Sequence, residues 1–169
     1  MPLKKPKELP KIPKTRKKKS GNALTAIPEK KPDKLEYVCK VFFGYDEATK
    51  TRLQKVCIET LVEFRSFAYE VSLEHWREKN EVFIVIMGLK SKTNIVPDIL
   101  PARTDVEFED LIGDVTINVI KQDGAINSAI FNINPFTKKI SLQKVFKSKK
   151  KNNRLFCSFE VAMERSVFP

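Results

Sequence analysis

The sequence lacks most of the features that mark catalytic and membrane-spanning proteins. Its 169 residues include one histidine, one tryptophan and five glycines. No apolar run reaches the roughly 18 residues that suggest a membrane-spanning helix. The amino terminus is basic but has no apolar block of the kind found in signal peptides. We therefore expect neither a transmembrane helix nor a signal peptide.

The number and spacing of the cysteines do not suggest disulfide bonds. The three cysteines, Cys39, Cys57 and Cys157, are an odd number at wide spacing. A disulfide framework needs pairs, and a structural zinc site usually needs closely spaced CxxC pairs. The cysteines therefore argue against both and favour a reducing compartment.

Acidic side chains are missing from one long segment. Residues 124–159 carry eight basic and no acidic side chains, and residues 1–34 carry twelve basic and three acidic ones. Residues 35–123 carry more acidic than basic side chains, so the net charge of +11 comes from two cationic segments around a mildly acidic body. Such asymmetry predicts an anionic partner.

The first 34 residues have the composition of a disordered arm. They hold six of the ten prolines, interspersed with lysines, and few large apolar residues. A segment of this kind cannot bury enough surface to fold alone and favours extended conformations. We predict a disordered, Lys/Pro-rich basic arm over residues 1–34 and a single globular domain over residues 35–169.

Hydrophobic periodicity predicts a mixed domain. Residues 35–45 alternate as a strand, residues 81–89 are nearly all apolar and indicate a buried strand, and four further strands follow from Asp114, two of them joined by an Asp-Gly turn. Between Asp46 and Lys79, apolar residues recur at steps of three and four, which predicts a long amphipathic helix. The expected fold class is α+β, with an antiparallel β-sheet packed against one long helix.

The residue types give no catalytic constellation. On the expected helix, Cys57 and the sole histidine, His75, would lie about 27 Å apart, too far for a nucleophile and its base. The glycines form no phosphate-binding loop. We expect no catalytic residue, no metal, no cofactor and no enzymatic activity.

Two dense basic clusters are the strongest functional signal. Each lysine or arginine can bind phosphate, either on nucleic acid or on anionic lipid. The arm contains no aromatic residue for base stacking, so we expect contact driven by charge and blind to sequence. The candidate residues for binding anionic lipid or nucleic acid are Lys14, Arg16, Lys17, Lys18, Lys19, Lys147, Lys149, Lys150, Lys151 and Arg154.

An apolar loop is the second unusual feature. Ile95, Val96, Ile99 and Leu100 lie among polar residues between residue 93 and the second of two prolines, Pro101. Such residues either fold onto the core or form an exposed tip that inserts at a membrane interface or into a partner. Both alternatives remain open at the level of sequence.

The order and texture of these segments resemble the matrix proteins of rhabdoviruses, especially the short ones of plant rhabdoviruses. A Lys-rich arm with prolines, "KTRKKKSGNALTAIPEKKP", precedes a first strand, "LEYVCKVFF". An expected helix ending in "HW", an apolar strand "FIVIMGL", the loop "NIVPDIL" and a β-rich remainder follow. The PPxY and P[TS]AP budding motifs of animal members are absent from this arm.

The resemblance implies a non-enzymatic viral structural protein of the virion. It would bridge the viral nucleocapsid, a nucleoprotein–RNA complex, and an anionic membrane, and it would lie in the host cytoplasm at the inner membrane face. It would also bind itself as a homo-oligomer, through a segment that includes Leu24, Ile27, Pro28 and Pro32. RNA could be bound directly, and nuclear entry is compatible with the basic arm.

Two other classes remain open. Basic arms and hairpins also occur in accessory subunits of ribonucleoproteins such as the ribosome, where they bind RNA. A peripheral adaptor could instead use "KTRKKK" as a nuclear import signal.

Overall fold

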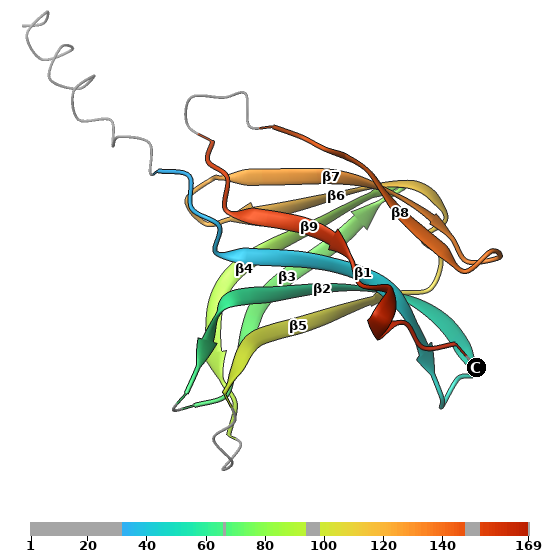
Figure 1. The fold of residues 1–169 in the computed structure, drawn as a ribbon, viewed down its shortest axis with the longest axis horizontal. Helices are drawn as coiled ribbons and strands as arrows, with labels where there is room; N and C mark the ends of the chain where they lie inside the picture. The colour runs from blue at the N-terminus through green and yellow to red at the C-terminus, as the bar shows by residue number, and fades with distance from the viewer. Residues whose placement is uncertain (1–31, 66, 94–98, 148–152, 169) are drawn as a thin grey trace, which may run out of the picture. The chain divides into compact units, whose positions relative to one another are not determined.

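The chain folds into two β-sheets that face each other (Figure 1). The computed structural model describes residues 32–168 except 66, 94–98 and 148–152, all within the second of two units, Lys31–Pro169. Its strands are β1 (Tyr37–Asp46), β2 (Thr51–Phe64), β3 (Tyr69–Glu78), β4 (Glu81–Ser91), β5 (Leu100–Phe108), β6 (Gly113–Lys121), β7 (Ile126–Asn134), β8 (Lys139–Val145) and β9 (Cys157–Val161). One 3₁₀ turn, η1 (Met163–Arg165), follows β9.

The strands are divided between a four-stranded and a five-stranded sheet. The first sheet has the order β5-β2-β1-β9 and the second has the order β3-β4-β6-β7-β8. Most neighbours are antiparallel, but β1 pairs with β9 and β4 pairs with β6 in parallel. In the second sheet β6, β7 and β8 form a meander, and after β8 the chain crosses to the first sheet, where β9 lies beside β1.

The core lies between the two sheets. Along β6 and β7 buried and partly exposed residues alternate, as expected for strands that turn one face inward. Fully buried side chains from both sheets meet there, among them Val41, Ile58, Ile84, Ile117 and Phe131. The alternation seen in the sequence of residues 114–134 is thereby confirmed.

The predicted α+β class is wrong, because the expected helix between Asp46 and Lys79 is a pair of strands, β2 and β3. Both faces of β2 are covered, so Val56, Cys57 and Ile58 are all buried and no alternation is visible. No glycine or proline marks the turn between β2 and β3. A strand buried on both faces resembles a helix when periodicity is the only guide.

Two finer predictions also need correction. Residues 100–108, for which no strand is predicted, form β5, which pairs with β2. The last strand, predicted to belong to the same antiparallel sheet as the others, pairs instead in parallel with β1 of the other sheet. A strand's own alternation of residues does not reveal which sheet it joins.

The outer face of the first sheet is covered by the C-terminal segment. The Ala162 amide donates to the Val41 carbonyl and the Val167 amide donates to the Phe43 carbonyl, both at 3.0 Å. The Arg165 guanidinium lies 2.9 Å from the Glu59 carboxylate. This segment buries Phe42 and Cys57 on the outside of the sheet, which explains the double-sided burial of β2.

The crossover into β9 is fixed by one buried amide, Asn127 of β7. Its Oδ1 accepts hydrogen bonds from the amides of Phe156 at 2.8 Å and Cys157 at 2.9 Å. Its Nδ2 donates to the Arg154 carbonyl at 3.0 Å. Three main-chain groups of the crossover therefore depend on a side chain that is 3% exposed.

We predict that Asn127→Ala lowers the free energy of unfolding by about 3 kcal/mol, because buried polar groups would lose their partners. Urea unfolding followed by circular dichroism measures the change. The matched control is Asn132→Ala on the same strand, where the amide donates to the Asp114 carboxylate at the surface. An equal, small effect for both variants would contradict the role given to Asn127.

Candidate functional site

Both basic segments are attached at one end of the sandwich. The Lys34 amide donates to the Leu155 carbonyl at 3.0 Å, and the Leu155 amide donates to Asp33 Oδ1 at 2.9 Å. The chain that leads in from residues 1–31 therefore runs beside the chain that leaves residues 148–152. We call this the arm end; the turns at residues 47–50, 79–80 and 135–138 lie at the opposite end.

A buried arginine ties these segments together. Arg154 is 5% exposed. Its Nη1 lies 2.7 Å from Glu36 Oε1, and its Nη2 lies 3.1 Å from Asp123 Oδ2. Lys121 Nζ lies 2.5 Å from the other Glu36 oxygen. The network joins the residue before β1, the β6–β7 turn and the crossover into β9.

The network shifts the pKa values of its members. Burial alone would raise the pKa of Glu36, but hydrogen bonds from Lys121 and Arg154 outweigh it and lower that pKa. Asp123 follows the same pattern: burial is outweighed by hydrogen bonds from the Ala125 amide and from Arg154, and the pKa falls. Burial would lower the pKa of Arg154, but Glu36 and Asp123 raise it. The charged forms are therefore favoured on folding.

The predicted basic residues have different surroundings. Arg154 is buried and paired with the carboxylates of Glu36 and Asp123, so it is not part of the proposed ligand surface. Lys147 is exposed. The remaining basic candidates lie outside the described residues: Lys14, Arg16, Lys17, Lys18, Lys19, Lys149, Lys150 and Lys151. Of the predicted self-association segment, Pro32 is exposed, and Leu24, Ile27 and Pro28 are outside the description.

A β-bulge in β2 turns apolar residues toward solvent. Opposite β5, Glu59 pairs with Arg103 and Glu63 pairs with Pro101, so β2 holds two extra residues in this interval. The Thr60 hydroxyl accepts from the Ala102 amide at 2.9 Å and donates to the Val62 carbonyl at 2.8 Å. Because a bulge breaks the alternation of a strand, neighbouring side chains can point away from the core.

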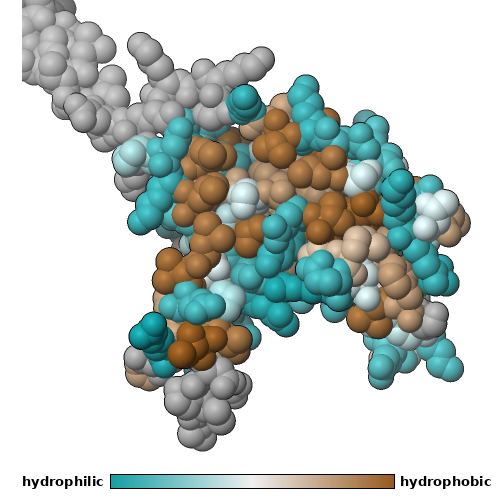
Figure 2. Space-filling view, viewed as in Figure 1, coloured by the Kyte–Doolittle hydropathy of each residue, from teal (hydrophilic) through white to brown (hydrophobic). Residues whose placement is uncertain are grey.

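The bulge and two neighbouring connections form what we call the apolar tip. Its members share half or greater exposure despite their size: Leu61 50%, Val62 64%, Phe67 62%, Ile99 56% and Leu100 55%. Figure 2 shows hydrophobic atoms at the ends of β2 and β5, beside the grey trace of residues 94–98. The predicted loop residues Ile99 and Leu100 are thus at the surface, and Ile95 and Val96 lie outside the described residues.

The sequence pattern missed three members of the apolar tip. Leu61, Val62 and Phe67 fall within the stretch predicted to be a helix, and that prediction gives no reason to expect them together at the surface. The usable signal is the run "TLVEF", in which adjacent apolar residues interrupt the alternation of a strand. Exposed charged side chains of both signs accompany the tip: Arg65, Lys90, Lys92 and Glu63. Lys90 Nζ lies 3.7 Å from the Glu70 carboxylate.

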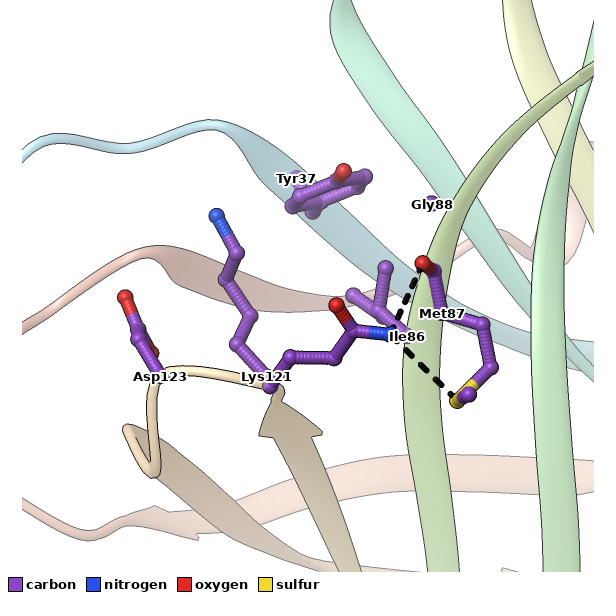
Figure 3. Close-up of a pocket in the computed structure, with 7 residues that line it drawn as sticks. Tyr37, Ile86, Met87, Gly88, Lys121 and Asp123 are labelled. Atoms are coloured by element: carbon purple, nitrogen blue, oxygen red, sulfur yellow. Dashed lines mark hydrogen bonds between the residues drawn. The ribbon is translucent and has the colours of Figure 1, made fainter.

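The apolar tip belongs to the arm end. The Leu61 amide donates to the Glu36 carbonyl at 3.0 Å, directly beside the arginine network. A pocket of ≈ 300 Å³ opens between the sheets at this end, with Tyr37 and Lys121 on one side and Ile86, Met87 and Gly88 across from them (Figure 3). Because Lys121 is bound to Glu36, the pocket offers no unneutralised ammonium to an anion.

The three cysteine thiols are poorly suited to act as nucleophiles. Burial raises the pKa of Cys57 to about 12, with a hydrogen bond to Asp105 acting in the same direction. Burial also raises the pKa of Cys157 to about 12 and that of Cys39 well above its ordinary value. Since the thiolate is the reactive form, these buried groups are packing residues. His75 lies on β3, not on a helix, with its ring 6.0 Å from that of Phe108.

The part of the chain that the structure describes has neither a metal-binding cluster nor a membrane-spanning helix. There, no group of three His, Cys, Asp or Glu side chains could hold a metal ion. Within the same residues, no helix has the length and apolar character needed to cross a membrane.

We predict that Glu36→Gln/Asp123→Asn lowers the free energy of unfolding by about 3 kcal/mol at pH 7, because a buried cation loses its partners. Both carboxyl pKa values are lowered on folding, so the native network adds stability above the ordinary values of 4.5 and 3.8 and loses it as the pH falls through the lowered ones. The difference between wild type and variant should therefore shrink as the pH falls below about 4.

Denaturant unfolding at pH 7, 5, 4 and 3 measures this difference. The matched control is Glu47→Gln/Glu164→Gln, which removes two exposed carboxylates elsewhere. A wild-type advantage that stays constant down to pH 3 would contradict the assigned pairing.

Comparisons with known proteins do not assign a family. No model of a known protein family, no curated protein and no solved structure matches this chain. The function is therefore inferred from the chemistry of the arm end.

Proposed function

We propose that the protein is a non-enzymatic assembly protein of the matrix type, which binds the anionic inner face of a membrane with its arm end. The single observation that carries the proposal is that three features share that end: the apolar tip, the attachment of the arm through Asp33 and Lys34, and the two ends of the basic loop, where Phe146 and Asn153 are hydrogen-bonded to β7. Apolar insertion flanked by basic charge is how peripheral proteins bind anionic bilayers.

Apolar insertion and attraction between charges contribute similar amounts to the free energy of membrane binding. A fully buried aliphatic or aromatic side chain gains about 1.5–3 kcal/mol, so each half-exposed member of the apolar tip offers roughly 1 kcal/mol on insertion. Each basic residue near an anionic surface contributes about 1 kcal/mol. Insertion alone or charge alone gives weak binding, and the combination supports stable but reversible attachment.

The apolar tip is what favours lipid over nucleic acid. RNA would be held by the basic segments as well, through phosphate contacts. Phe67 and Leu100, however, are more than half exposed, and Leu100 with its aliphatic neighbours has no base-stacking surface. Exposed apolar side chains of this kind favour contact with the apolar part of a lipid bilayer. Binding to RNA is the alternative outcome of the tests below.

A bridging role needs further partners. We propose that the basic arm also contacts a nucleocapsid, and that the segment with Leu24, Ile27, Pro28 and Pro32 binds a neighbouring copy. The support is the resemblance to matrix proteins together with the density of basic charge in residues 1–34. Salt-dependent oligomers at the vesicle surface are the expected form of this self-association.

We predict that Phe67→Ser/Ile99→Ser/Leu100→Ser weakens binding to phosphatidylserine-containing vesicles by about two orders of magnitude, because roughly 3 kcal/mol of insertion is lost. Since these side chains are already exposed, the melting temperature should change by less than about 3 °C. Co-sedimentation with vesicles and thermal unfolding provide the two measurements.

The matched control places the same change at the opposite end. Phe136, Ile112 and Val167 are 83%, 48% and 55% exposed, and Phe136→Ser/Ile112→Ser/Val167→Ser should leave vesicle binding within about twofold. Binding of the wild type to structured RNA but not to vesicles would overturn the membrane proposal. A large fall in melting temperature for the tip variant would show that its residues belong to the core.

We also predict that replacing Lys147, Lys149, Lys150 and Lys151 with Gln weakens vesicle binding by roughly one to three orders of magnitude at 0.1 M salt, at about 1 kcal/mol per residue. The dependence on salt should become shallower, because fewer charges are screened. Lys50, Arg52, Lys79 and Lys138 changed to Gln provide a matched control on the far turns. Equal losses from the two sets would show that net charge, and not the arm end, governs binding.

A further inference from the structure

The strand β8 presents an unpaired edge. It is the last strand of the five-stranded sheet and pairs only with β7. Every second N–H and C=O of an edge strand points away from its sheet, which makes the edge a template for one more strand. In β8 this alternation shifts by one residue at a bulge between Leu142 and Lys144. Among the described residues, no main-chain hydrogen bond reaches this outer side of residues 139–145.

Apolar side chains line the space below that edge. Leu142 and Val145 lie opposite Phe131 and Ala129, which are fully buried, so they point inward. They remain 37% and 42% exposed, because the facing strand β9 has only five residues. Figure 2 shows hydrophobic atoms over the region where Figure 1 places β9 and the β7–β8 edge. An added strand would cover them.

The charge of the edge selects its occupant. Lys139 and Lys144 are exposed on β8 itself and point to its outer face, and residues 124–159 contain no acidic side chain. A second copy of β8 would bring these lysines together, and the arm of the chain is also basic. Like charges on neighbouring strands are destabilising, whereas opposite charges add about 0.2–1 kcal/mol per pair. The complementary occupant is therefore acidic.

We propose that the β8 edge binds an extended, acidic polypeptide segment of another protein as an additional strand of the five-stranded sheet. The main chain of the segment pairs with β8, its alternate apolar side chains cover Leu142 and Val145, and its carboxylates face Lys139 and Lys144. Strand addition of this kind takes affinity from the main chain and specificity from alternate side chains. The inference does not depend on the membrane contact proposed for the arm end.

The test uses the full-length protein and a fluorescein-labelled ten-residue peptide of alternating Glu and Val. Fluorescence anisotropy should show binding that Lys139→Glu/Lys144→Glu weakens by at least about tenfold, since attractive pairs become repulsive. The matched charge reversal Lys50→Glu/Arg52→Glu, on the β1–β2 hairpin, should change binding by less than about twofold. Circular dichroism checks that each variant is folded.

Backbone methylation separates strand addition from attraction between charges. Two versions of the peptide carry N-methyl groups on alternate amides in opposite phase, so that only one version loses the donors facing β8. One version should lose binding and the other should keep it. Equal binding of both methylated peptides, or equal loss for the two charge-reversed proteins, would overturn the proposal.

Discussion

The buried guanidinium of Arg154 is the contact on which the arm end depends. A charge that is 5% exposed is tolerated only when partners compensate for lost hydration, and Glu36 and Asp123 do so from two other segments. Since the three residues come from the start of β1, the β6–β7 turn and the crossover, their pairing fixes all three in place. Asn127 also holds the crossover in place, through uncharged hydrogen bonds to its main chain. The two basic segments share one end of the sandwich because of these contacts.

The same arrangement explains how charge is divided between structure and surface. Residues 124–159 contain no acid, so the partners of Arg154 must come from elsewhere in the chain, and Glu36 and Asp123 supply them. The lysines of this segment have no carboxylate nearby in sequence, and those that the structure describes, Lys138, Lys139, Lys144 and Lys147, are exposed. Arg154 stabilises the crossover, and the exposed lysines give this part of the surface a positive potential.

Sequence patterns were reliable where one face of a strand meets the core. The alternation of β6 and β7 and the Asp-Gly turn between them predicted that hairpin correctly. They failed at β2, because the C-terminal segment buries Cys57 from outside while the core buries Val56 and Ile58 from within. The exposure of Leu61 and Val62 depends on a bulge set by the Thr60 hydroxyl, a contact with a distant strand. The burial of Arg154 depends on acids far away in the chain. Each of these failures has a tertiary cause.

The arm end combines two forces with different ranges. Charge acts over about one Debye length, roughly 8–10 Å in physiological salt, and therefore governs approach and orientation. In the proposed membrane contact, burial of Val62, Phe67 and Leu100 would act only on contact and would govern how long the protein stays bound. Because the basic segments and the apolar tip lie at the same end, approach by charge would bring the apolar residues toward the same surface. An arm attached at the opposite turns would hold the same charge yet turn the tip away. The position of Asp33 and Lys34 beside Leu155 thus matters as much as the number of lysines in the arm.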